Sequence, residues 1–204
     1  MAKLSHLMGL MLMSCFLTGC IGGEKITLQN SFDPSMYSAG LAPGPNTISG
    51  QSALIIEKKL GPDMICKCGI SQGAAVYLMP VIPVTTELMI RLFGNDLIAY
   101  APVTTPPSTN GVDKQIFYKA HRGDCDKFGS FTFDNLADGS YYLWMETRGR
   151  EEFSSSVSYY GGTFMKKITV RGGQKVSVNL MRELGLKLPD FKKSPGHSSY
   201  VRDK

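Results

Sequence analysis

Three cysteines in the body of the chain, Cys66, Cys68 and Cys125, are the residues whose type and spacing most readily suggest chemistry. Thiols can form a disulfide, exchange one, or bind a metal. A bridge within Cys66-Lys67-Cys68 would close a very small, strained ring, whereas either cysteine could join the distant Cys125 with relaxed geometry. The spacing therefore favours one structural disulfide between Cys125 and either Cys66 or Cys68.

The same cysteines leave two chemical alternatives open. A remaining thiol could exchange with its neighbour, which would make the protein a thiol-redox enzyme or accessory factor of the envelope. Together with His121, the three cysteines could instead hold zinc, although the usual Cys-x-x-Cys spacing of zinc sites is missing. We favour the structural bridge, and we predict no metal and no cofactor.

Other catalytic patterns are missing from the sequence. It contains no His-Glu-x-x-His zinc pair, no Gly-x-Ser-x-Gly and no phosphate-binding glycine-rich loop. We expect His121 and His197 at the surface. Asp124 and Asp126, on either side of Cys125, offer too few oxygen ligands for calcium. We therefore predict no catalytic residues and a protein that is not an enzyme.

The first twenty residues are built like a bacterial export signal. Lys3 supplies a positive start, a mostly apolar segment follows over residues 7–17, and small residues precede Cys20. The apolar segment is too short to span a bilayer stably. An ordinary signal peptide, or a buried apolar helix with a chance cysteine, stays open as an alternative.

The ending Leu17-Thr18-Gly19-Cys20 resembles the lipobox of bacterial lipoproteins. That resemblance implies cleavage before Cys20, which then carries diacylglycerol and usually an amide-linked acyl chain such as palmitate. Several acyl chains hold a protein on a membrane far more firmly than one. Ile21 stands where aspartate would retain enteric-type lipoproteins in the inner membrane, so we expect the periplasmic face of the outer membrane. The envelope is oxidising, which suits a disulfide.

Composition argues against a nucleic acid partner. The chain has 204 residues and a formal net charge of +5, which becomes +4 if Lys3 leaves with the signal. The basic pairs are isolated, and no basic stripe is interleaved with aromatic residues; the pairs are Lys58-Lys59, Lys166-Lys167 and Lys192-Lys193. We therefore expect a membrane partner through the lipid, and no nucleic acid.

The first half of the chain predicts a tether followed by strands and one helix. Residues 20–45 are rich in Gly, Ser, Asn and Pro, which indicates a tether, and strands are predicted over 47–56 and 74–79. A helix should run from Thr85 or Thr86 through Phe93, with Leu88 and Leu92 on one face and Gly94 as its stop. We interpret residues 96–112 as a long loop, either a recognition surface or, preferably, an insertion.

The second half predicts strands over residues 115–120, 130–134, 141–145, 163–170 and 175–180. Within 141–145, both alternating faces are apolar, so one should pack on the core and the other be covered. Gly139 is expected at positive φ in a turn, and Gly172-Gly173 suit a tight hairpin. The pattern predicts an all-β fold, a Greek-key-like antiparallel β-sandwich of about seven strands with one short helix.

Three units then resemble the carboxypeptidase regulatory-like, or transthyretin-like, β-sandwich: Ile48-Ser49-Gly50-Gln51, residues 73–80 (GAAVYLMP) and residues 129–141 (GSFTFDNLADGSY). The resemblance covers residues 46–182. It implies a central strand through Val76-Tyr77-Leu78, and two strands joined by a short corner in the last unit. It implies no activity, because a fold does not carry function by itself.

These observations give the predicted organisation. Residues 1–19 are a lipoprotein signal peptide, 20–45 a lipidated tether, 46–182 the β-sandwich and 183–204 a C-terminal tail. We expect a noncatalytic, membrane-anchored envelope lipoprotein that binds a protein or glycan partner or scaffolds an assembly. The alternative is a thiol-redox or metal-dependent envelope factor that uses Cys66, Cys68 and Cys125.

Overall fold

A computed structural model describes residues 25–51, 53–58, 61–67, 76–126, 129–153 and 156–179, and for 53–58, 61–67, 147–153 and 156–160 it describes the backbone alone. Cys20, Cys68 and the predicted signal peptide and C-terminal tail lie outside the described residues. None of the described helices has the length and apolar character that crossing a bilayer requires.

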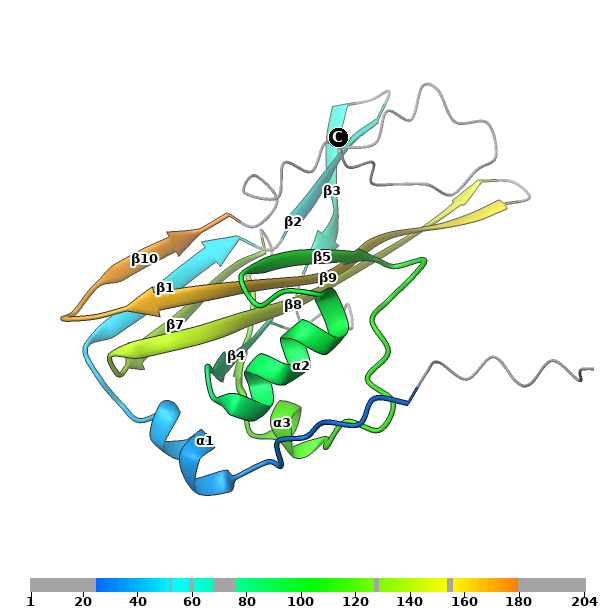
Figure 1. Cartoon of the computed structure of the whole chain (residues 1–204). Coiled ribbons are helices and arrows are strands. Elements are labelled where there is room, and N and C mark those ends of the chain that lie inside the picture. Colours follow the sequence, from blue (N-terminus) through cyan, green and yellow to red (C-terminus); the bar gives the residue numbers. More distant parts are fainter. Residues whose placement is uncertain are drawn as a thin grey trace, which may run out of the picture.

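The described strands form an all-β sandwich, as the sequence predicts (Figure 1). An antiparallel five-stranded sheet has the order β5-β9-β8-β4-β6, a three-stranded sheet has the order β10-β1-β7, and β2 and β3 pair only with each other within the described residues. The bounds are β1 Asn46–Gln51, β2 Ala53–Lys58, β3 Gly61–Lys67, β4 Val76–Pro80, β5 Ile98–Pro102, β6 His121–Gly123, β7 Ser130–Leu136, β8 Gly139–Phe153, β9 Ser156–Val170 and β10 Lys175–Val178.

The alternating apolar residues of β8 separate two cores. Tyr141, Leu143 and Met145 belong to the main core between the two large sheets, together with Ile48, Val76, Leu78, Phe131, Phe133, Leu136, Phe164, Ile168, Val170 and Val178. Tyr142 and Trp144 point to the opposite face and join a second, helix-side core. Successive side chains of a strand face opposite sides. Because the side chains on both sides of β8 are buried over residues 141–145, the prediction that both faces are covered is confirmed.

Three helices cover that opposite face: α1 Pro34–Gly40, α2 Pro83–Phe93 and α3 Gln115–Tyr118. Leu88 of α2 is fully buried there, and Gly94 ends α2 at φ 74°, both as predicted. The helix begins earlier than predicted, because Pro83 fits its first turn. Thr85 lies inside that turn, where its hydroxyl accepts the main-chain N–H of Ile82 at 3.0 Å and donates to the Pro80 carbonyl at 2.6 Å.

The part of the predicted tether that is described packs on the sandwich. Asp33 caps α1, since its Oδ1 accepts the main-chain N–H of Ser35 at 2.8 Å. Tyr37 of α1 is 1% exposed and donates its hydroxyl proton to the Ile116 carbonyl at 2.6 Å. Burial also raises the pKa of the Tyr37 phenol. The chain is therefore ordered well before residue 46.

Four further predictions need correction. Residues 115–120 are not a strand, because α3 occupies 115–118, and the predicted loop over 96–112 contains β5, which pairs with β9. Strand β10 pairs with β1 in parallel, so Gly172 and Gly173, both at positive φ, lead from one sheet into the other instead of closing a hairpin. Gly139 lies in β8 without a positive φ; among the described non-glycine residues, Asn135 takes that conformation.

Candidate binding groove along helix α2

The N-terminal segment, residues 25–30, is fastened to α2 by the carboxylate of Glu87. Its Oε1 accepts the main-chain N–H of Gln29 at 2.7 Å, and its Oε2 accepts that of Asn30 at 2.8 Å. These two amides, the Gln29 amide first, hold the pKa of Glu87 below its usual range. At neutral pH the carboxylate is charged and the segment is clamped to the helix.

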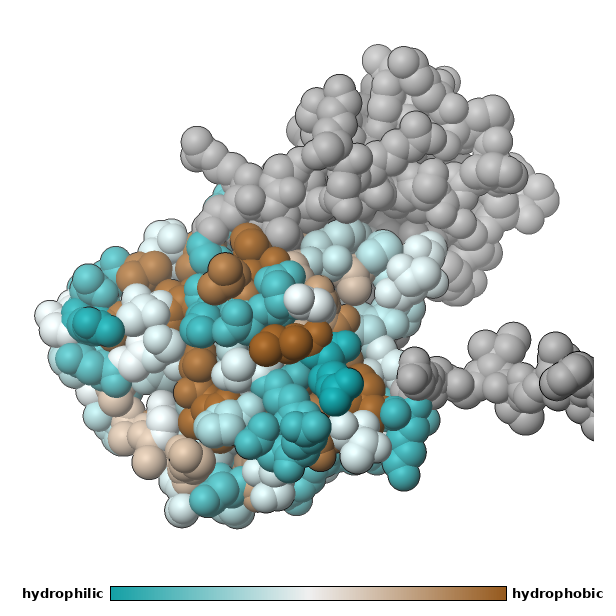
Figure 2. All heavy atoms as spheres, viewed as in Figure 1, coloured by the Kyte–Doolittle hydropathy of each residue, from teal (hydrophilic) through white to brown (hydrophobic). Residues whose placement is uncertain are grey.

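A groove of about 550 Å³ runs between this segment and α2. Its lining combines apolar side chains with hydrogen-bonding groups: Gln29, Asn30, Val81, Ile82, Pro83, Thr86, Glu87, Ile90 and Arg91. Ile90 is 48% exposed, although it is a large apolar residue. Figure 2 shows hydrophobic and hydrophilic residues side by side over the face on which α2 lies. We call the groove lined by these nine residues, from Gln29 to Arg91, the α2 groove.

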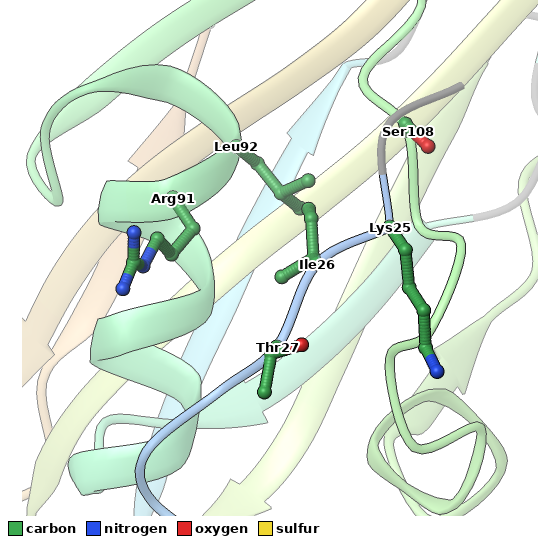
Figure 3. Close-up of a pocket in the computed structure, with 6 residues that line it drawn as sticks. All are labelled: Lys25, Ile26, Thr27, Arg91, Leu92 and Ser108. Atoms are coloured by element: carbon green, nitrogen blue, oxygen red, sulfur yellow. The ribbon is translucent and has the colours of Figure 1, made fainter.

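A second depression of about 270 Å³ adjoins the α2 groove, and the two share Arg91. Ile26 and Leu92, which pack against the helix-side core, lie close together at its centre (Figure 3). Lys25 and Arg91 point away from this apolar centre on opposite sides in Figure 3. Among the described residues that line the depression, none is acidic. The depression thus has two apolar side chains at its centre, the polar residues Thr27 and Ser108 in its lining, and a cation at each of two edges.

A polar cluster beneath α2 fixes the helix to the sheet. The Tyr142 hydroxyl donates either to Thr86 Oγ1 at 3.1 Å or to Asp96 Oδ2 at 3.2 Å, and Lys167 Nζ lies 2.8 Å from the same Asp96 oxygen. Burial raises the pKa of Tyr142 to about 12, and the hydrogen bond from Lys167 lowers that of Asp96. Because Thr86 also lines the α2 groove, this cluster sets the position of the groove wall.

The predicted site residues are only partly placed by the structure. Cys125 follows β6, packs against the main core and is disulfide-bonded. Cys66 lies on β3 opposite Leu54, but its side chain and all of Cys68 are outside the description, so the choice of partner stays a prediction. The side chains that are described contain no group of three or more His, Cys, Asp and Glu residues suited to a metal. The zinc and redox alternatives, which need Cys66 and Cys68, stay untested.

The α2 groove was not predicted from the sequence. Glu87 on one wall contacts Asn30 and Gln29 on the other, and these two residues lie 57 and 58 positions away from it in the sequence. One signal was present: Leu88 and Leu92 define the buried side of α2, and Ile90 breaks the pattern by placing an apolar residue on the other side.

Comparisons with known proteins add little to this geometry. No family model and no curated protein matches the chain. One solved structure, described as a "putative carbohydrate binding protein" from Pseudomonas aeruginosa, is similar over 72% of this chain and 96% of that chain, with 20% identity and a TM-score of 0.49. At these values, nothing that the neighbour binds is carried over to this chain.

Proposed function

We propose that the protein is a noncatalytic binding module, held at the periplasmic face of the outer membrane by lipid on Cys20, and that the α2 groove takes its partner. The observation that carries the proposal is the half-exposed Ile90 in a groove of about 550 Å³ that also presents hydrogen-bonding groups. Binding sites typically combine an apolar surface with a few placed polar groups. We also propose that the domain is a carboxypeptidase regulatory-like β-sandwich, which serves as the scaffold that carries the α2 groove.

The lining of the groove favours a protein partner over a glycan. Val81, Pro83 and Ile90 suit apolar side chains, and Asn30 and Arg91 can meet the polar groups of a peptide. Sugar rings commonly stack on aromatic faces, but the described residues that line the groove include no aromatic residue. Tyr118, which is 73% exposed on α3, is the aromatic residue better suited to a glycan.

Photocrosslinking in intact cells tests the proposal. A photoreactive amino acid at Ile90 should capture a discrete partner, and the same probe at Lys175, exposed on β10, should not. With the purified partner, Ile90→Asp should weaken binding at least tenfold without moving the denaturation midpoint, whereas Lys175→Asp should bind normally. Equal capture from both positions would contradict the proposal. So would glycan binding that is lost in Tyr118→Ala and kept in Ile90→Asp.

A further inference from the structure

We propose that the face carrying Lys25 and Arg91 docks on the anionic headgroups of the membrane in which Cys20 is anchored. The inference rests on the proposed lipid anchor and extends it, since an anchor alone leaves the orientation of the domain undefined. Docking would give the domain one orientation on the membrane and would place the α2 groove at the membrane surface.

The chain between the proposed anchor and the domain is short. Cys20 precedes Lys25 by five residues. A fully extended chain spans at most about 3.6 Å per residue, so Lys25 lies within about 18 Å of the lipidated residue. The N-terminal segment is clamped to α2 by Glu87 from residue 29 on. The short connection therefore brings this face, and not the β10 side of the sandwich, toward the lipid.

The face of the domain nearest the proposed anchor carries two cationic side chains. Lys25 and Arg91 are both exposed, and the described lining of the depression between them holds no carboxylate. The carboxylate of Glu87, one turn before Arg91 on α2, interacts electrostatically with the Arg91 guanidinium and offsets part of its charge, so the two positive charges and this negative charge leave the face with a net charge of +1. A basic residue near an anionic leaflet contributes about fivefold to binding, provided that it lies within about a Debye length of 10 Å. The anchor length makes that approach sterically accessible.

Two apolar side chains lie between the charges. Ile26 and Leu92 stand at the centre of the depression, and Thr27 and Ser108 complete its lining. Long basic side chains keep their charges at headgroup level while their stems cover apolar surface. Lys25 and Arg91 flank this apolar centre in Figure 3, an arrangement that fits a lipid interface better than a small enclosed anion site.

Docking has a consequence for the proposed partner. The α2 groove and the cationic depression share Arg91, so the groove would open beside the membrane surface. Such an opening favours a partner that is itself membrane-associated, and the α2 groove remains its binding site.

Hydrogen exchange of the full lipidated protein in vesicles tests the inference. Mass spectrometry first establishes whether Cys20 is acylated. We then expect exchange in residues 25–30 and in the last turn of α2 to slow at least fivefold in vesicles containing phosphatidylglycerol, relative to phosphatidylcholine alone. Inorganic phosphate added to the neutral vesicles should not reproduce the slowing, because a surface is required and not a single anion.

Charge-neutralising variants supply the matched control. Lys25→Gln/Arg91→Gln should abolish the slowing, whereas Arg122→Gln/Lys175→Gln, which removes the same charge from exposed positions on β6 and β10, should retain it. Acylated protein that shows no slowing, or that loses it equally in both double variants, would overturn the docking. Protein without acyl chains would instead overturn the proposed anchor, and the inference with it.

Discussion

One carboxylate oxygen of Glu87, Oε2, accepts both the main-chain N–H and the side-chain Nδ2–H of Asn30, each at 2.8 Å. These bonds join α2 to a segment far away in the sequence and create one wall of the α2 groove. The chain N-terminal to the sandwich is therefore a structural part of the candidate site.

Glu87→Gln should loosen the N-terminal segment. The glutamine amide keeps one acceptor oxygen, and its NH2 group would face an N–H donor of Gln29 or Asn30. We therefore expect faster hydrogen exchange at residues 29 and 30 and, because solvent screens this partly exposed site, a loss of at most about 1 kcal/mol in the free energy of unfolding. Asp124→Asn, which removes an exposed carboxylate next to β6, is the control. Unchanged exchange at residues 29 and 30 would show that Glu87 does not hold the segment.

Gly111→Ala should displace the same segment from its other side. Gly111 has φ +85°, and an added Cβ would lie 2.6 Å from the Ile26 carbonyl oxygen and 2.7 Å from Lys25 Cγ. Gly94→Ala is the matched control, because Gly94 has φ +74° but nothing within 4 Å of the added Cβ. Each variant should lose about 1 kcal/mol through backbone strain. Only Gly111→Ala should accelerate exchange over residues 25–30, and equal acceleration in both would refute the collision.

Asp138 should make stability depend on pH in the acid range. The Asn46 side chain and then the Gly172 amide hydrogen-bond its carboxylate and lower its pKa. The folded protein therefore holds the charged form more strongly than the unfolded chain, whose pKa is about 3.9. This stabilisation is present above that value and is lost as the pH falls through the folded pKa. Urea midpoints at pH 6 and pH 3 should differ less in Asp138→Asn than in the wild type; identical differences would exclude this role.

Cys125→Ser should destabilise the domain by about 2–4 kcal/mol, the usual contribution of a disulfide that closes a long loop. Cys125 is disulfide-bonded, and Cys66 and Cys68 are the predicted partners. Cys66→Ser and Cys68→Ser should therefore have smaller effects, if the remaining neighbour can take over the bond. Nonreducing peptide mapping, with thiols blocked at lysis, would identify the linked peptide. Three reduced thiols would contradict the structural bridge and favour the metal alternative.

Strand faces were predictable because their signal is local and repeats every two residues. The alternation along β8 identifies both of its covered faces from the sequence alone. One face carries Tyr141, Leu143 and Met145, and the other carries Tyr142 and Trp144. The stop of α2 at Gly94 was equally local, since a glycine accepts the left-handed conformation of a helix end.

The errors arose where long-range contacts decide the local structure. Residues 115–118 contain Ile and Phe and resemble a strand, but they form α3, with Ile116 buried in the helix-side core and Phe117 packed against Trp144. The helix over 34–40 has a local signal, Asp33-Pro34, but the Gly, Ser, Asn and Pro residues around it favour a tether. The turn before β8 placed its left-handed residue at Asn135 and not at Gly139.

The groove could not be derived in this way, because no local pattern relates Gln29 and Asn30 to Glu87. Only the exposed apolar residue on the outer side of α2, Ile90, marked the helix as having more than a packing role. Sequence periodicity identifies which residues are buried, whereas a surface depression depends on how distant segments meet.

Metabolic labelling with a clickable fatty acid tests most directly whether the domain is presented from a membrane by lipid on Cys20. The account predicts label on the wild-type protein, partitioning into detergent, and mass spectrometry that finds the acyl chains on an N-terminal Cys20. Cys20→Ala should take up no label and accumulate as unprocessed precursor, because the thioether requires the Cys20 sulfur. Undiminished labelling of Cys20→Ala, or a wild-type protein without label, would contradict the anchored binding module.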